Sequence, residues 1–261
     1  MAHLNADALQ HGHPIRGIEA YCSMERTDVQ RRLAGLDWGR IETCLWQHGY
    51  AKTPVLLTPA ECDDLVGLYD IDAHFRSRVQ MAPHHFGQGE YKYFKYPLPS
   101  LIQALRTHAY PALAGVANEW AAALGHADRY PADHSAFLRH CLKHGQTQPT
   151  PLLLRYGSGG YNCLHQDLYG DVAFPLQLTV FLSRREQDYT GGEFLLVEQR
   201  PRMQSRGEAI PTEQGEMLIF ATRYRPLSGK RGYYRVNVRH GVSTVHWGSR
   251  FALGVIFHDA G

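Results

Sequence analysis

The sequence predicts a mainly β protein whose helical N-terminal half packs against an all-β core. Helical periodicity and capping signals occur in residues 26–150, whereas short β-rich runs follow in residues 151–261. No linker-like stretch separates the two parts. We therefore expect one integrated domain over residues 26–261, after an irregular lead-in at residues 1–25 that shows no periodic pattern.

Composition and charge limit the class of protein. A chain of 261 residues with 44% hydrophobic and 20% charged residues is typical of a globular protein with a substantial core. The net charge of +2 does not by itself predict nucleic-acid binding. The five cysteines are scattered and lack CxxC spacing, and neither a long apolar run nor a signal-peptide pattern is present. These features favour a cytoplasmic protein with no membrane segment.

Apolar spacing and capping signals predict the helices of the first part. The clearest signal is "TPAEC", in which Thr58 is a potential N-cap, Pro59 lies in the first turn and Glu61 follows three residues after the cap. The helices are expected over residues 28–48, from residue 58 onward, over residues 98–125 as one helix or two broken near Pro111, and over about residues 132–144.

The second part consists of short runs rich in β-branched and aromatic residues, separated by Gly, Pro and polar turns. Strands at this spacing favour a sandwich or a barrel. The runs are "PLLLRY", "FPLQLTVFLS", "GEFLLVE", "GEMLIFA", "YYRVNVRHGVSTV" and "RFALGVIF".

A potential metal site begins directly after a glycine-rich bend, "YGSGGYNCLHQD". In an extended segment His165 and Asp167 point to the same side, so an imidazole nitrogen and a carboxylate oxygen face one ion. His240, in a later strand-like run, supplies a third ligand.

Other histidines and one cysteine are weaker candidates for a site. His126-Ala127-Asp128 repeats the H-x-D spacing, but it lies in a predicted surface turn with no matching ligand downstream. His140 and His144 are four residues apart on a predicted helix, where a solvated face is favoured over zinc binding. Cys163 lies near the metal candidates, and a buried structural thiol is favoured there.

Arg250 opens the last strand-like run. By the period of two, Arg250, Ala252 and Gly254 share one face of this strand. An arginine followed by two small residues leaves a cavity beside a positive charge. We expect this cavity to suit a dianionic small molecule, because a guanidinium can bind a carboxylate through two parallel hydrogen bonds.

These residues carry a resemblance to a known family. H-x-D, a distant histidine and a basic residue about ten positions later resemble the Fe(II)- and 2-oxoglutarate-dependent oxygenases. "YGSGGYNCLHQD", "GGEF" and "RHGVSTVHWGSR" are similar to the prolyl-hydroxylase branch. The chain from residue 48 onward also resembles a bacterial family of oxygenases for the oxidative demethylation of damaged DNA. "GQGEYKYFKYPLP", "GQTQPTPLLLRYG", "NCLHQDLYGD", "GGEFLLVEQRPRMQSR" and "GVIFHDA" carry that second resemblance.

The resemblance implies a double-stranded β-helix (jelly-roll) core with helices packed on one sheet. It also implies an enzyme that uses Fe(II), 2-oxoglutarate and O2 to hydroxylate a substrate C–H bond, releasing succinate and carbon dioxide. His165, Asp167 and His240 would bind the metal, and Arg250 would hold the far carboxylate of 2-oxoglutarate. Tyr156 and Thr179 are further candidate contacts to the co-substrate. Phe181 stands where some prolyl hydroxylases have a tyrosine that contacts this carboxylate.

The sequence is compatible with more than one class of substrate. Alternating aromatic and basic residues in "YKYFKY", together with the arginines of "EQRPRMQSR", are compatible with an alkylated DNA or RNA substrate. An amphipathic strand and a solvated basic rim that bind no nucleic acid would give the same two sequence patterns. The alternatives are a protein side-chain (prolyl) hydroxylase and a non-catalytic jelly-roll binding protein. The candidate substrate residues are Tyr91, Lys92, Tyr93, Lys95, Arg200, Arg202 and Arg206.

Overall fold

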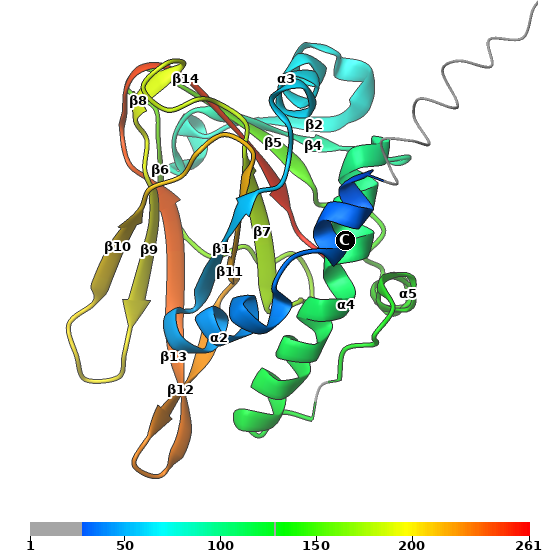
Figure 1. Cartoon of the computed structure of the whole chain (residues 1–261), viewed down its shortest axis with the longest axis vertical. Coiled ribbons are helices and arrows are strands. Elements are labelled where there is room, and N and C mark those ends of the chain that lie inside the picture. The colour runs from blue at the N-terminus through cyan, green and yellow to red at the C-terminus, as the bar shows by residue number, and fades with distance from the viewer. Residues whose placement is uncertain (1–27, 128) are drawn as a thin grey trace, which may run out of the picture.

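The computed structural model describes residues 28–127 and 129–261, so the predicted lead-in at residues 1–25 lies outside the described residues. Two antiparallel sheets face each other, and helices lie against the outer side of the larger sheet (Figure 1). This architecture confirms the predicted jelly-roll core with helices packed on one sheet.

The larger sheet has eight strands. In spatial order they are β1 (Tyr50–Val55), β11 (Glu216–Ala221), β7 (Leu176–Phe181), β14 (Val245–Val255), β5 (Leu152–Gly157), β4 (Glu90–Phe94) and β2 (Phe75–Gln80), and β8 (Tyr189–Gly191) pairs with β14.

The smaller sheet has six strands. In spatial order they are β10 (Arg206–Ile210), β9 (Phe194–Gln199), β13 (Gly232–Val242), β6 (Tyr161–His165) and β3 (Gly87–Gln88), and β12 (Tyr224–Gly229) pairs with β13. The strands β13 and β14 are therefore central in the two facing sheets. They carry His240 and Arg250, whose side chains line one cavity.

The sequence predicts the start of helix α3 (Pro59–Gly67) correctly. The Thr58 side chain accepts a hydrogen bond from the Glu61 amide, and the Glu61 side chain accepts one from the Thr58 amide, which completes a capping box. Helix α4 (Ser100–Ala123) runs through Pro111 without a break, so the one-helix alternative holds for this segment. Helix α5 (His134–Lys143) begins at the cap residue Asp133.

The helical prediction over residues 28–48 holds, but the structure divides the segment into two helices. A helical segment at residues 28–34 ends in a turn, and helix α2 (Trp38–His48) starts anew after Asp37. The Asp37 side chain accepts a hydrogen bond from the Arg40 amide, which satisfies a donor at the new helix N-terminus. The apolar spacing on both sides of the turn is helical, but the cap divides it.

The prediction that residues 26–150 are helical is wrong for four segments. Strands β1, β2, β3 and β4 come from this part of the chain. β1 pairs with β11, β3 with β6 and β4 with β5, so distant strands satisfy their backbone groups, and β2 pairs in turn with β4. Local helical periodicity carries no information about those partners.

One large hydrophobic cluster joins the helices to both sheets. Tyr110 of α4, Phe137 of α5, Phe174 and Phe257 are all buried, with ring centroids 4.9–5.8 Å from the Tyr110 ring. The cluster continues to Val238 of β13. No helix among residues 28–127 and 129–261 combines the length and apolar character that a membrane crossing requires.

Candidate active site

Three potential metal ligands meet between the two sheets. His165 ends β6, Asp167 follows two residues later, and His240 lies directly opposite His165 in the β6–β13 pair. His165 Nε2 is 3.5 Å from Asp167 Oδ1, and His240 Nε2 is 3.2 Å from Asp167 Oδ2. The ligand atoms lie within 4.8 Å of one another, and no other such cluster of three or more is present in the described part of the chain. Two imidazole nitrogens and one carboxylate in this arrangement fit a divalent transition metal.

The two imidazoles are oriented by different surroundings. His165 Nδ1 lies 2.7 Å from the Cys163 carbonyl oxygen, to which it donates a hydrogen bond, so Nε2 is the ring nitrogen that faces Asp167. The His240 ring is parallel to that of Phe194 and packs against Phe220, with centroids 5.8 and 4.8 Å away. These contacts aim both Nε2 atoms at the same point.

The Asp167 carboxylate is held on both oxygens. The Tyr169 hydroxyl donates to Oδ1 at 2.9 Å, and the Gln177 amide donates to Oδ2 at 3.0 Å. Burial alone would raise the pKa of Asp167, but hydrogen bonds and charge from His165 and His240 hold the pKa well below its usual range. The carboxylate is therefore anionic, as a metal ligand must be.

The pKa values of the two histidines shift in opposite directions. Burial would lower the pKa of His165, but the Asp167 carboxylate outweighs burial and raises it. Burial and the charge of His165 lower the pKa of His240. The three groups thus act as one electrostatic unit around the carboxylate.

Gln166, between the two ligands of the H-x-D segment, ties this segment to the strand that carries His240. Its amide nitrogen donates to the carbonyl oxygens of Arg223 and Val238, each at 2.8 Å. Because Val238 precedes His240 by two residues on β13, the position of His165 and Asp167 is coupled to that of His240.

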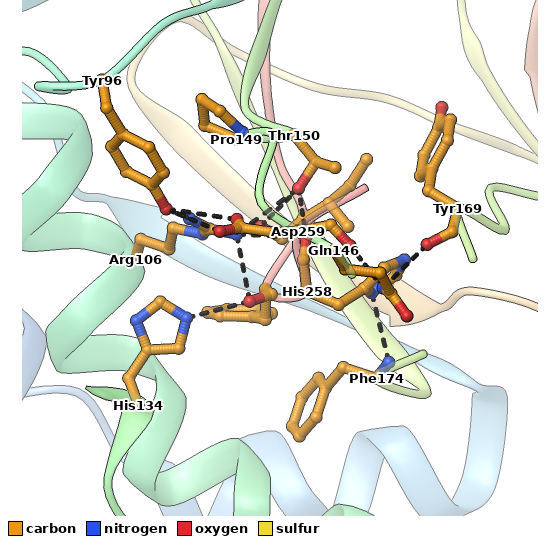
Figure 2. Close-up of polar contacts among 12 residues, drawn as sticks. Tyr96, Arg106, His134, Gln146, Pro149, Thr150, Tyr169, Phe174, His258 and Asp259 are labelled. Carbon is orange, nitrogen blue, oxygen red and sulfur yellow. Dashed lines mark hydrogen bonds and ion pairs between the residues drawn. The ribbon is translucent and has the colours of Figure 1, made fainter. Parts of the chain in front are cut away.

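A buried polar network anchors the loop that follows Asp167 (Figure 2). Gln146 donates to the carbonyl oxygens of Tyr169 and Val172 at 3.0 and 2.9 Å and accepts from the Val172 amide at 2.8 Å. His258 Nδ1 accepts a hydrogen bond from the Phe174 amide at 3.2 Å. The loop that carries Tyr169 is therefore fixed from both the helical layer and the C-terminal segment.

The same network is centred on a buried ion pair. Arg106 of α4 donates to Asp259 at 2.7 Å and to the carbonyl oxygens of Ile256, Phe257 and His258 (Figure 2). Sequence reasoning missed this group of residues. The available signal was the similarity of "GQTQPTP" and "GVIFHDA" to the bacterial family, since these motifs contain Gln146, His258 and Asp259.

The triad lines a cavity of about 360 Å³ that also contains the predicted co-substrate residues. Arg250, Tyr156 and Thr179 all line it, together with Ala252 and Gly254, as the period of two along β14 predicts. Arg250 lies directly opposite Tyr156 in the β14–β5 pair.

Arg250 is fully buried, and its Nε and Nη2 atoms have no hydrogen-bond partner among the residues that the structure describes. The rings of Tyr156, Phe181 and Tyr189 surround the guanidinium at 5.6, 5.6 and 5.9 Å. A buried, unpaired charge is costly, so binding of an anion in the cavity would stabilise these donors. The carboxylate of a small organic acid has the matching geometry.

The structure separates the predicted substrate residues of "YKYFKY". Tyr91 lines the cavity, whereas Tyr93 is buried and its hydroxyl donates to that of Tyr169 at 2.9 Å. Lys92 is only 5% exposed and binds Asp72 and the carbonyl oxygen of Tyr69. Lys92 therefore cannot contact a substrate phosphate, and its predicted role is wrong. Lys95 is exposed beyond the end of β4 and does not line the cavity.

The predicted arginines lie elsewhere. Arg200 and Arg206 line a separate, small cavity and pair with Glu198 and Glu208, respectively. Arg202 is exposed in the turn between β9 and β10. None of the predicted basic substrate residues lines the triad cavity, and the β9–β10 hairpin extends away from β4 (Figure 1).

Two of the weaker candidates are also placed. Cys163 is exposed and lines the cavity, so the buried structural thiol predicted there is wrong. His140 and His144 are exposed on α5, with ring centroids 4.6 Å apart, as expected for a solvated helix face.

Comparisons with known proteins agree with this geometry. A model of the Oxygenase-NA family, described as an oxygenase catalysing oxidative methylation of damaged DNA, matches residues 89–260. An uncharacterised protein of Mycobacterium tuberculosis is 50% identical over 167 residues, which are 64% of this chain and 72% of that protein.

Solved structures share the fold. An oxidoreductase of the 2OG-Fe(II) oxygenase family from Burkholderia pseudomallei superposes with a TM-score of 0.52 at 14% identity, over 86% of this chain and 93% of that chain. The non-haem α-ketoglutarate-dependent epimerase SnoN of nogalamycin biosynthesis gives a TM-score of 0.51 at 13% identity, over 83% and 80%. The chain therefore belongs to the Oxygenase-NA family, and it is an oxygenase with the fold of the 2-oxoglutarate–Fe(II) enzymes.

Proposed function

We propose that this oxygenase uses Fe(II), 2-oxoglutarate and O2 to hydroxylate an N-alkyl group on a nucleic-acid base. The observation that carries the proposal is the unpaired guanidinium of Arg250 in the same cavity as the triad of His165, Asp167 and His240. One cavity thus contains a metal donor set and a receptor for an organic dianion. The non-catalytic binding protein is set aside, because the family is one of oxygenases.

The roles of the residues follow from their geometry. The Nε2 atoms of His165 and His240 and a carboxylate oxygen of Asp167 would hold Fe(II). With 2-oxoglutarate and O2 the metal would supply the oxidising power to place one oxygen atom in the substrate, with succinate and carbon dioxide as the other products. Tyr169 and Gln177 keep the Asp167 carboxylate in place.

Arg250 binds the far carboxylate of 2-oxoglutarate through its two free nitrogens. The Tyr156 hydroxyl, which accepts a hydrogen bond from Asn162 at 3.2 Å, has its own proton available for this carboxylate. Thr179 of the neighbouring strand β7 lines the same cavity and lies directly opposite Gly254 of β14. Phe181 contributes only its ring to the Arg250 surroundings, so Tyr156 takes the hydroxyl role that a tyrosine at position 181 would have.

The remainder of the cavity suits a flat, largely apolar group. Tyr91 and Tyr169 line its wall, and Phe86, Leu164 and Leu168 line it while being 48%, 41% and 42% exposed. We call these last three residues the mouth of the cavity. A base in a duplex must leave the helical stack to reach such a site, and aromatic and apolar walls accept a base that has done so. Hydroxylation of an N-methyl group then gives a hemiaminal that loses formaldehyde.

The deciding experiment measures formaldehyde released from single-stranded oligonucleotides that carry N-methylated bases. We expect release above the background of the His165→Ala variant, with one succinate formed per formaldehyde. Absence of release over that background, across several N-alkyl lesions, would overturn the nucleic-acid assignment.

A second candidate is hydroxylation of a protein side chain, and the resemblance to prolyl hydroxylases favours proline. The observation in its favour is that three exposed residues that line the cavity, Phe86, Leu164 and Leu168, are apolar. A mass increase of +16 on a proline-containing peptide, dependent on 2-oxoglutarate, would support it.

We also propose that residues 26–261 act as one domain, since one hydrophobic cluster joins α2–α5 to both sheets. The four described cysteines are free, which favours a cytoplasmic site of action.

A further inference from the structure

Strand β13 presents opposite chemistry on its two faces. Val236, Val238 and His240 are buried and face the core, whereas the alternating residues Arg235 and Arg239 are exposed. Arg239 therefore lies on the outer face of the same strand that carries a proposed metal ligand on its inner face.

The cations of this region fall into two groups. Three are neutralised by ion pairs: Arg200 and Arg225 pair with Glu198, and Arg206 pairs with Glu208. The others form no ion pair with any residue that the structure describes, and neither β12 nor β13 contains an acidic residue. These exposed cations are Arg202, Arg223, Lys230, Arg231, Arg235 and Arg239.

An aromatic ring lies among the cations. The half-buried ring of Tyr224 has the guanidinium carbons of Arg223 and Arg235 at 5.8 and 5.1 Å from its centroid. Tyr224 is directly opposite Asn237 in the β12–β13 pair, so the ring, the amide and the guanidinium groups share one face. From residue 231 to residue 239 this face extends for about 26 Å.

The outer face is connected to the cavity. Gln166 and Leu164 line the cavity, and the Gln166 amide donates to the carbonyl oxygens of Arg223 and Val238. Arg223 and Arg239 thus lie next to the backbone atoms that hold the H-x-D segment. The β12–β13 hairpin continues this face away from the rest of the two sheets (Figure 1).

We propose that Arg223, Tyr224, Arg235, Asn237 and Arg239, here called the β13 strip, bind the backbone of single-stranded nucleic acid and lead it to the cavity. Unpaired guanidinium groups attract phosphates, and an aromatic ring between them accepts a base without regard to sequence. The proposal rests on the proposed function, but it concerns binding of undamaged strand and is tested without the chemistry.

The experiment measures fluorescence anisotropy of a labelled, undamaged 15-nucleotide oligo-dT over a range of salt concentrations. The Arg235→Gln/Arg239→Gln variant should bind at least tenfold more weakly than the unmodified protein at low salt. The slope of log Kd against log salt should fall by about 1.4, as expected for two lost phosphate contacts to a single strand. The Arg235→Lys/Arg239→Lys variant keeps both charges and should keep the slope.

The matched control is Arg139→Gln/Lys143→Gln, which removes two exposed cations from α5. Equal weakening in this control, or an unchanged slope in the Arg235→Gln/Arg239→Gln variant with an unchanged melting temperature, overturns the strip. Displacement of oligo-dT by polyglutamate at equal charge concentration would instead assign the strip to an acidic polypeptide. If formaldehyde is released but the Arg235→Gln/Arg239→Gln variant binds oligo-dT like the unmodified protein, only the role of the β13 strip is overturned. If the variant weakens binding as expected but no formaldehyde is released, only the proposed function is overturned.

Discussion

At the scale of single residues, Arg250 is distinguished because its buried guanidinium lacks hydrogen-bond partners among the described residues. Two of its nitrogens are buried without a partner, although aromatic rings enclose the group on three sides. Replacement by alanine removes a charge-assisted pair with 2-oxoglutarate, so the 2-oxoglutarate requirement should rise at least tenfold while Fe(II) affinity barely changes. Titration of substrate-independent 2-oxoglutarate turnover measures this. Arg155→Ala is the control, since Arg155 is exposed and pairs with Phe251 on the opposite face of the strand from Arg250. An unaltered requirement in Arg250→Ala would move the role to another residue.

The triad residues should each be indispensable for metal binding. His165→Ala, Asp167→Ala and His240→Ala each remove one bond to the metal, so we expect a sharp loss of Fe(II) affinity and no substrate-independent turnover. Metal content after anaerobic loading and 2-oxoglutarate consumption are the measurements. His126→Ala and His144→Ala are controls that should leave both properties near normal. A His165→Ala protein with unaltered iron binding would show that the triad is wrong.

Gln177 lines the cavity, and its amide donates a hydrogen bond to Asp167, so we assign it a role in positioning this carboxylate. Its loss frees one carboxylate oxygen to turn away from the two histidines. We expect Gln177→Ala to weaken Fe(II) binding roughly tenfold to a hundredfold. Co(II) titration followed by visible absorption reports both affinity and coordination geometry, and the control is Gln103→Ala, whose side chain bonds Thr107 within α4. Equal Co(II) affinity and an identical spectrum in Gln177→Ala would contradict the role.

At the scale of elements, the short strand β3 beside the mouth depends on one glycine. Gly87 has φ of +133°, and a Cβ atom there would lie 2.3 Å from the Tyr161 carbonyl oxygen of β6. Gly87→Ala should therefore separate β3 from β6 and lower the free energy of unfolding by roughly 1–3 kcal/mol or more. Urea unfolding measures the loss. Gly207→Ala in β10 is the control, because its Cβ would make only an ordinary contact with Val197 at 3.7 Å. Equal stability of the two variants would count against this close approach.

At the scale of the whole molecule, the polar network that joins α4, α5 and the C-terminal segment predicts acid sensitivity. Burial, then the charge of Arg106, lower the pKa of His134 to about 3 and that of His258 to about 4. In the unfolded chain both groups take up protons near pH 6.5, whereas in the folded protein they stay neutral. The unfolded state therefore binds more protons, and stability should fall as the pH decreases from 6.5 toward these folded values.

This dependence can be assigned to one residue. His134→Gln removes one of the two groups while retaining a side-chain donor for the Phe257 carbonyl oxygen. Between pH 6.5 and 5 the variant should lose stability less steeply than the unmodified protein. Urea unfolding at several pH values gives both slopes. Parallel slopes would show that His134 does not contribute.

Much of the candidate site follows from local rules that the sequence contains. The period of two places His165 beside Asp167 and Arg250 beside Ala252 and Gly254, because a strand sends alternate side chains to opposite faces. The capping box at Thr58 is equally local. In both cases the interacting atoms lie within a few residues, so neighbouring letters are sufficient to predict the geometry.

Other features were decided only by the tertiary structure. Lys92 is buried because β4 lies between β2 and β5, and Gln146 reaches the loop after Asp167 because α5 and the C-terminal segment pack beside it. Arg200 pairs with Glu198, while Arg239, exposed on the outer face of β13, forms no ion pair within residues 28–127 and 129–261. The alternation of residues determines which side chains share a face. Only the pairing of distant strands determines whether that face meets solvent, a carboxylate or the core, since those partners are far away in the chain.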